Sequence, residues 1–173
     1  EPMILHSITL KSAEKVSDYD TVKQMWDENG AQVTSGQYIR IEAENASVTS
    51  SQMLYPRQDQ SSPVVYPSSP KYLLNNTIGD NSWRLAHQWI EWDFEVPETG
   101  YYYISLHAKQ SYQRGINVSR KITIDGKVPF EEMSAYEFKY NSRWKNVVLS
   151  DKDGNPYYFY LEKGSHKIRM EAV

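Results

Sequence analysis

The chain has 173 residues, a formal net charge of −3 and 39% hydrophobic residues, which fits a folded domain of ordinary size and not a disordered segment. It has no cysteine, which excludes a disulfide framework, a thiolate metal site and a cysteine nucleophile. Acidic and basic residues are interleaved, so we expect no nucleic-acid partner, and no apolar run is long enough for a transmembrane segment.

The first 36 residues are predicted to form an N-terminal extension that contains one helix, at about residues 18–29. Tyr19, Val22 and Trp26 are spaced three and four residues apart, so they share one face of that helix. We expect this apolar stripe to pack on the domain's own sheet. The alternative is that it docks onto another part of a longer protein.

From residue 37 the hydrophobic pattern changes to a period of two, which is typical of strands. In Tyr38–Glu44, the apolar side chains at 39, 41 and 43 would face one way, and Arg40, Glu42 and Glu44 would face the other. Residues 46–86 then lose periodicity and are rich in serine, proline and asparagine. Long ordered loops tend to be functional, so we expect this region to take part in binding.

The clearest strand pattern is Ile90–Val96, followed by a turn at Pro97–Gly100 and a second alternating run at residues 102–108, which together predict a hairpin. Further strands are predicted at Val118–Asp125, Trp144–Leu149, Tyr157–Leu161 and Ser165–Val173. Seven short strands without intervening helices predict an all-β fold. We expect residues 37–173 to form an antiparallel jelly-roll β-sandwich, preceded by the one short N-terminal helix.

The order of these segments resembles carbohydrate-binding module families 6 and 35, which are galactose-binding-like β-sandwiches. The resemblance rests on the following segments: Ile41–Ala46, Trp92–Tyr102, Ile122–Gly126, the Trp144 strand and Leu161–Ile168. The run Thr123–Glu132 is similar to the N-terminal modules of large extracellular solute-binding lipoproteins of sugar ABC transporters in Firmicutes. The similarity to that group covers residues 38–173.

This resemblance implies a non-catalytic module that binds an oligo- or polysaccharide. It also implies that the module belongs to a larger bacterial extracellular or cell-surface protein, lipid-anchored through a part outside this chain. In the resembled families a Glu-Ala-Glu strand supplies ligands to a structural Ca²⁺, so Glu42 and Glu44 become candidate calcium ligands. The alternative is that these two glutamates form a solvated face, paired with Arg40 or a neighbouring strand.

Sugar binding would require aromatic rings outside the core, because the C–H face of a pyranose packs on a tryptophan or tyrosine ring while amides and charged groups bind its hydroxyls. The chain has 14 tyrosines and 5 tryptophans. Trp92 is expected to pack in the core. The candidate ligand-binding residues are Trp83 with Asn81 and Arg84, Trp144 with Arg143, and Tyr112 in a neighbouring loop.

No catalytic residue is predicted. The four histidines are scattered without metal-ligand spacing, and the chain has no G-x-S-x-G nucleophile motif. Two hypotheses of different classes therefore remain. The first is a carbohydrate-binding module, and the second is a structural or protein-interaction domain on the same fold that binds no sugar.

Overall fold

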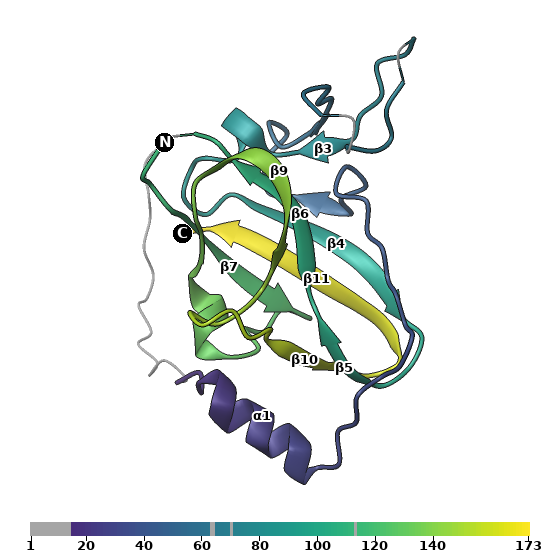
Figure 1. The fold of residues 1–173 in the computed structure, drawn as a ribbon, viewed down its shortest axis with the longest axis vertical. Helices are drawn as coiled ribbons and strands as arrows, with labels where there is room; N and C mark the ends of the chain where they lie inside the picture. The colour runs from purple at the N-terminus through teal and green to yellow at the C-terminus, as the bar shows by residue number, and fades with distance from the viewer. Residues whose placement is uncertain (1–14, 63–64, 70, 113) are drawn as a thin grey trace, which may run out of the picture.

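The computed structural model describes residues 15–62, 65–69, 71–112 and 114–173 (Figure 1). The fold is an antiparallel β-sandwich with one short helix, α1 (Tyr19–Glu28), as the sequence predicts. The strands are β1 (Val48–Thr49), β2 (Pro56–Arg57), β3 (Thr77–Ile78), β4 (Trp89–Val96), β5 (Gly100–Tyr103), β6 (Ser105–Gln110), β7 (Val118–Ile124), β8 (Tyr136–Phe138), β9 (Asn141–Val148), β10 (Tyr158–Leu161) and β11 (Gly164–Ala172). The 3-10 turns are η1 (Asp80–Ser82) and η2 (Glu131–Ser134).

One layer is a five-stranded sheet in the order β1-β4-β11-β7-β8, and the other consists of the pairs β10-β5 and β6-β9. Figure 1 shows the second layer in front of the first, with the β2-β3 pair at one end. Apolar side chains on the facing surfaces of the two layers are buried. They include Ile90, Trp92, Ile122, Ile168 and Met170 from the first layer, and Phe159 and Leu161 from the second. Burial of this apolar surface is the main force that holds the two layers together.

The helix begins and ends where its local chemistry dictates. The side chain of Asp18 accepts a hydrogen bond from the backbone N–H of Thr21 at 2.8 Å, which caps the first turn. Gly30 follows the last turn with a φ of +80°, and the N–H of Ala31 returns to the carbonyl of Trp26 at 3.0 Å.

The apolar stripe of the helix packs on the domain's own sheet, which confirms the first of the two alternatives. The ring centroid of Tyr19 lies 4.8 Å from that of Tyr157, and the ring centroid of Trp26 lies 6.1 Å from that of Tyr101. Val22, between them on the same face, is buried. The helix therefore covers the outer surface of the β5-β10 pair, as Figure 1 shows. Residues 1–14 of the predicted extension lie outside the described residues.

The predicted strand at Tyr38–Glu44 is wrong. This segment has no strand partner and turns back at a hydrogen bond from the N–H of Asn45 to the carbonyl of Glu42. The expected orientation is also lost, because Ile41 is exposed while Glu42 is half-buried. The edge of β4 is instead paired by the two residues of β1, and the carbonyl of Ala43 accepts the indole N–H of Trp92 at 2.9 Å. Trp92 itself is buried in the core, as predicted.

The predicted hairpin between Ile90–Val96 and residues 102–108 is also wrong in its pairing. The strands exist, but β4 pairs with β1 and β11, while β5 pairs with β10 and β6 with β9. The turn before Gly100 therefore carries the chain from one layer to the other. Gly100 has a φ of +157°, and a Cβ at this position would lie 2.6 Å from the carbonyl oxygen of Gln32. Only glycine allows the two backbones to approach this closely.

Candidate functional site

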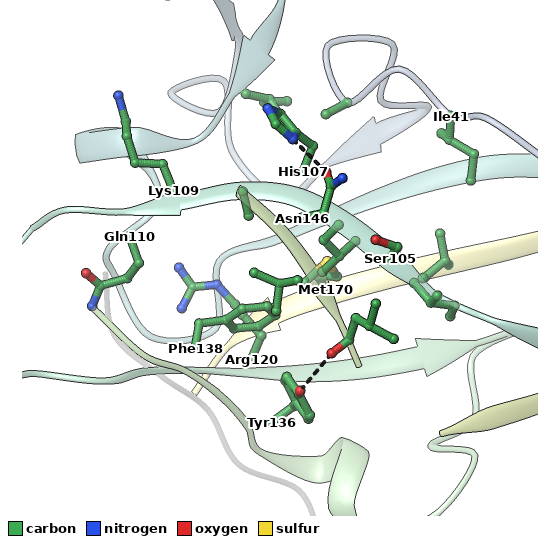
Figure 2. A pocket seen from close by; sticks show the side chains of 18 of the residues that line it. Ile41, Ser105, His107, Lys109, Gln110, Arg120, Tyr136, Phe138, Asn146 and Met170 are labelled. Carbon is green, nitrogen blue, oxygen red and sulfur yellow. Dashed lines mark hydrogen bonds between the residues drawn. The ribbon is translucent and has the colours of Figure 1, made fainter. Parts of the chain in front are cut away.

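A large hollow follows the β6-β9 pair on both of its faces (Figure 2). Its volume of about 2670 Å³ exceeds that of an ordinary small-molecule pocket, about 300–1,000 Å³. The volume alone therefore identifies no binding site. The candidate site is instead defined by the side chains that make specific contacts. Figure 2 shows His107 and Lys109 on one side of β6, and Arg120, Phe138 and Met170 on the other.

Trp144 of β9 is tied to a residue 85 positions away in the sequence. Its indole Nε1–H donates to the Oδ2 of Asp59 at 3.1 Å. The ammonium of Lys109 donates to the same carboxylate oxygen at 2.8 Å and lies 5.1 Å from the centroid of the Trp144 ring. The long loop that precedes β4 and the β6-β9 pair are thus joined at the tryptophan.

His107 completes an aromatic surface beside Trp144. Its ring lies 7° from parallel with the indole, with 5.5 Å between the ring centroids. The Nδ1 of His107 shares a hydrogen bond of 2.8 Å with the Oδ1 of Asn146, drawn as a dashed line in Figure 2. Both His107 and Asn146 are exposed and Trp144 is half-buried. We refer to Trp144, His107, Asn146, Lys109 and Asp59 as the Trp144 platform.

Asp59 is held in its charged form at this position. Burial acting alone would raise the pKa of Asp59, but hydrogen bonds from Lys109 and Ser61 outweigh it and lower the pKa to about 2. Its backbone is fixed too, because the buried amide of Asn76 accepts from the Asp59 N–H at 2.8 Å and donates to the Asp59 carbonyl at 3.0 Å. The platform is therefore built on a loop that is itself anchored.

Trp83 has the contacts of a packing residue. Its indole N–H donates to the carbonyl of Gln88 at 3.0 Å, and its ring packs against the core. The guanidinium of Arg120 lies over the ring, 4.4 Å from its centroid. Asn81, in η1, and Arg84, directly after Trp83, are exposed. This group lies at the start of β7, whereas the Trp144 platform is organised around Asp59.

Arg143 and Tyr112 are both exposed. Arg143 precedes Trp144 on β9, so its side chain leaves the opposite face of the strand. Tyr112 lies in the loop after β6, and its side chain is 68% exposed. Neither side chain has a hydrogen bond, ion pair or ring contact with the platform.

The sequence interpretation missed four members of the platform and Arg120. His107 and Asn146 lie on predicted strands and Lys109 directly follows one, but nothing in their spacing shows that β6 pairs with β9. Asp59 is hidden in a loop without periodicity. Arg120 left a readable signal, because it interrupts the alternating apolar row of Val118, Ile122 and Ile124.

Of the two candidate calcium ligands, Glu42 forms an ion pair with Arg40. The Nε of Arg40 lies 2.6 Å from the Oε1 of Glu42, which is the pairing that the alternative interpretation expects. Across residues 15–173, the described part of the chain has no cluster of three or more histidine, aspartate or glutamate side chains suited to a metal ion. Two glutamates, one of them paired, are too few oxygen ligands for Ca²⁺. Calcium at Glu42 and Glu44 therefore stays a prediction.

No protein-family model and no curated protein matches the sequence. Among solved structures, a cycloisomaltooligosaccharide glucanotransferase from a Paenibacillus species, complexed with cycloisomaltoheptaose, shares the fold with a TM-score of 0.52 and 19% identity. The match covers 88% of this chain and 20% of that chain. A ruminal GH26 endo-β-1,4-mannanase matches with a TM-score of 0.47 and 17% identity over 81% of this chain and 24% of its own.

The likeness to the glucanotransferase shows that the two chains share a fold. This chain spans 20% of the glucanotransferase and 24% of the mannanase. Within the described residues, no helix has the length and apolar character needed to cross a membrane.

Proposed function

We propose that this domain is a non-catalytic carbohydrate-binding module of a larger bacterial extracellular, solute-binding protein. The single observation that carries the proposal is the Trp144 platform. It offers two nearly parallel rings beside an exposed amide and a fixed, charged Lys109–Asp59 pair. Aromatic faces beside preorganised polar groups are the combination that a sugar ring requires.

The platform is suited to binding because its members are already positioned. Asp59 anchors the indole N–H and the ammonium of Lys109 at once, so little side-chain entropy remains to be lost on binding. The fold neighbour named above gives independent support. It is a carbohydrate-active protein in which a domain of this shape makes up about a fifth of the chain.

The non-catalytic part of the proposal rests on how the titratable groups are engaged. Two of the three acids of β4 are ion-paired, since Glu91 binds Arg169 at 2.7 Å and Asp93 binds Lys167 at 3.0 Å, and the third, Glu95, accepts a hydrogen bond from the hydroxyl of Ser165. His166 has both ring nitrogens in hydrogen bonds. These contacts are those of structural ion pairs, and none of these residues lines the hollow.

A glycan array of neutral and acidic oligosaccharides tests the proposal, followed by calorimetric titration of the best ligand. Trp144→Ala is expected to weaken binding at least tenfold. Trp89→Ala is the matched control, because Trp89 lies on the outer face of the five-stranded sheet beneath the Arg169 guanidinium, 3.8 Å away. Binding that survives Trp144→Ala and falls with Trp89→Ala would move the site to the other sheet. Absence of binding to every glycan would favour the structural-domain hypothesis.

A further inference from the structure

The outer face of the second layer continues past the Trp144 platform towards α1. Alternate residues along β5 and β6 pack against the core, and they are Tyr102, Ile104 and Leu106. The side chains that alternate with them leave the outer face: Tyr103, Ser105 and His107. Tyr103 is 59% exposed, and the other two are exposed as well. At about 3.4 Å per residue, Tyr103 and His107 lie roughly 13 Å apart along the chain.

The cross-strand partners widen this row into a strip, because residues directly opposite each other in a sheet share a face. From the α1 end to the platform, the opposite pairs are Tyr103–Tyr158, Ser105–Val148 and His107–Asn146. We refer to these residues as the outer strip. Serine and valine are smaller than the rings on either side, so the outer strip is lowest in its middle and has aromatic side chains at both ends.

The outer strip ends at α1. Tyr101, two residues before Tyr103, leaves the same face but is buried. Its ring centroid lies 6.1 Å from that of Trp26 and 5.2 Å from the ammonium of Lys23, and its hydroxyl donates to Asp27 at 2.8 Å. A helix with its side chains is about 10–12 Å across. Because α1 is seated on the β5-β10 pair, it rises above the outer strip as a wall at that end (Figure 1).

The chemistry of this surface suits an uncharged ligand with many hydroxyl groups. The outer strip offers the hydroxyls of Tyr103, Tyr158 and Ser105 and the amide of Asn146. The formally charged side chains of the adjoining platform, Lys109 and Asp59, are paired with each other at 2.8 Å. A charged ligand would have to compete with that pair, whereas a neutral sugar needs only rings to stack on and polar groups beside them.

We propose that the domain binds a linear, neutral oligosaccharide along the outer strip, with one end of the sugar chain against α1. One sugar unit stacks on the rings of Trp144 and His107, and a second unit stacks on Tyr103. The inference rests on the proposed carbohydrate-binding function. It adds the charge and shape of the ligand, and it makes Tyr103 a binding residue.

The test is an NMR titration, which also measures weak binding, with neutral glucose and mannose oligosaccharides from disaccharide to hexasaccharide. We expect affinity to rise at least tenfold from the disaccharide to the tetrasaccharide and then to level off, because α1 ends the outer strip. Tyr103→Ala should weaken tetrasaccharide binding at least fivefold and leave disaccharide binding unchanged. Trp144→Ala should weaken both.

Two further variants separate the ring of Tyr103 from a general effect of the substitution. Tyr103→Phe keeps the stacking face and should retain most of the affinity for the tetrasaccharide. Tyr72→Ala is the matched control, because Tyr72 is 69% exposed in the long loop and lies outside the outer strip. A Tyr103→Ala variant with a lowered melting temperature and weaker binding of every oligosaccharide would mean that Tyr103 is only structural.

Titration with a long neutral polysaccharide of the preferred linkage tests the wall. Binding of one domain per polysaccharide chain is expected, because only a chain end fits against α1. Binding of many domains along each chain would overturn the end recognition.

Failure of this inference is distinguishable from failure of the proposed function. Equal binding of disaccharide and tetrasaccharide, or binding of charged glycans alone, would overturn the outer strip and keep the carbohydrate-binding module. Binding of no glycan, neutral or acidic, would overturn both.

Discussion

Replacement of Asp59 by alanine should loosen the Trp144 platform and destabilise the whole domain. The carboxylate accepts from Lys109, Trp144 and the backbone of Ser61, and its side chain is only 17% exposed. A hydrogen bond to a charged group contributes about 1.5–3 kcal/mol to the free energy of unfolding, and one between neutral groups contributes about 1 kcal/mol. Partial exposure to solvent weakens both contributions. We therefore expect a loss of about 2–3 kcal/mol in the free energy of unfolding. In a domain of this size that lowers the melting temperature by roughly 5–10 °C.

Urea denaturation followed by tryptophan fluorescence measures this loss, and a double-mutant cycle with Lys109→Met isolates the ion pair. We expect a coupling energy of about 1–2 kcal/mol between the two positions. Asp153→Ala, in an exposed turn, is the control and should change stability by less than about 0.5 kcal/mol. A loss for Asp59→Ala no larger than that of the control, or a coupling energy of zero, would refute the anchoring role of Asp59.

The same site has a defined acid dependence. Because the folded-state pKa of Asp59 is about 2, below its unfolded value of about 4, its contribution is present above pH 4 and is lost as pH falls through 2. The stability difference between wild type and Asp59→Asn should therefore shrink across that window. A difference that stays constant from pH 5 to pH 2 would contradict the assigned contacts.

Three further outcomes are expected. Burial of His166 opposes its charge, but the Asp125 carboxylate and a backbone carbonyl raise its pKa, so its contribution to stability is present below pH 6.5 and is lost as pH rises through the folded-state pKa. His166→Gln should flatten that dependence in melting curves, and an unchanged pH profile would contradict it. Melting with and without EDTA tests calcium at Glu42 and Glu44, where no shift would rule out a structural ion. Trp26→Ala, which removes the ring that docks the helix, should cost about 2–4 kcal/mol by urea denaturation, and a cost below 1 would mean that the helix is not part of the cooperative fold.

The sequence was sufficient to predict the helix and those strands whose hydrophobic pattern and flanking residues lie close together in the chain. The helix has a cap, a stripe and a terminal glycine within a dozen residues, so its position follows from residues 18–30 alone. Strands β4, β7 and β11 alternate clearly, and the structure confirms them. However, a hydrophobic pattern with a period of two indicates only that one face of a strand is buried. It does not indicate which strand is the hydrogen-bonded partner.

Pairing therefore had to come from the structure, and both errors of the sequence interpretation follow from this. Tyr38–Glu44 alternates without being a strand, because β1 takes the edge of β4. Residues 90–108 alternate on both sides of a turn without forming a hairpin, because the close approach at Gly100 sends the chain across to the other layer. The binding platform depends on the same long-range pairings, so only its tryptophan was predicted.

The most direct test of the carbohydrate-binding claim is a two-dimensional ¹H–¹⁵N NMR titration of the indole N–H signals with the best glycan ligand. The five tryptophans give five such signals, and the N–H of Trp92 and that of Trp144 have different acceptors, the carbonyl of Ala43 and the carboxylate of Asp59. The account predicts that the Trp144 signal shifts with saturation while the Trp92 signal stays in place. Saturable binding that moves the Trp89 signal and leaves Trp144 unchanged would contradict it.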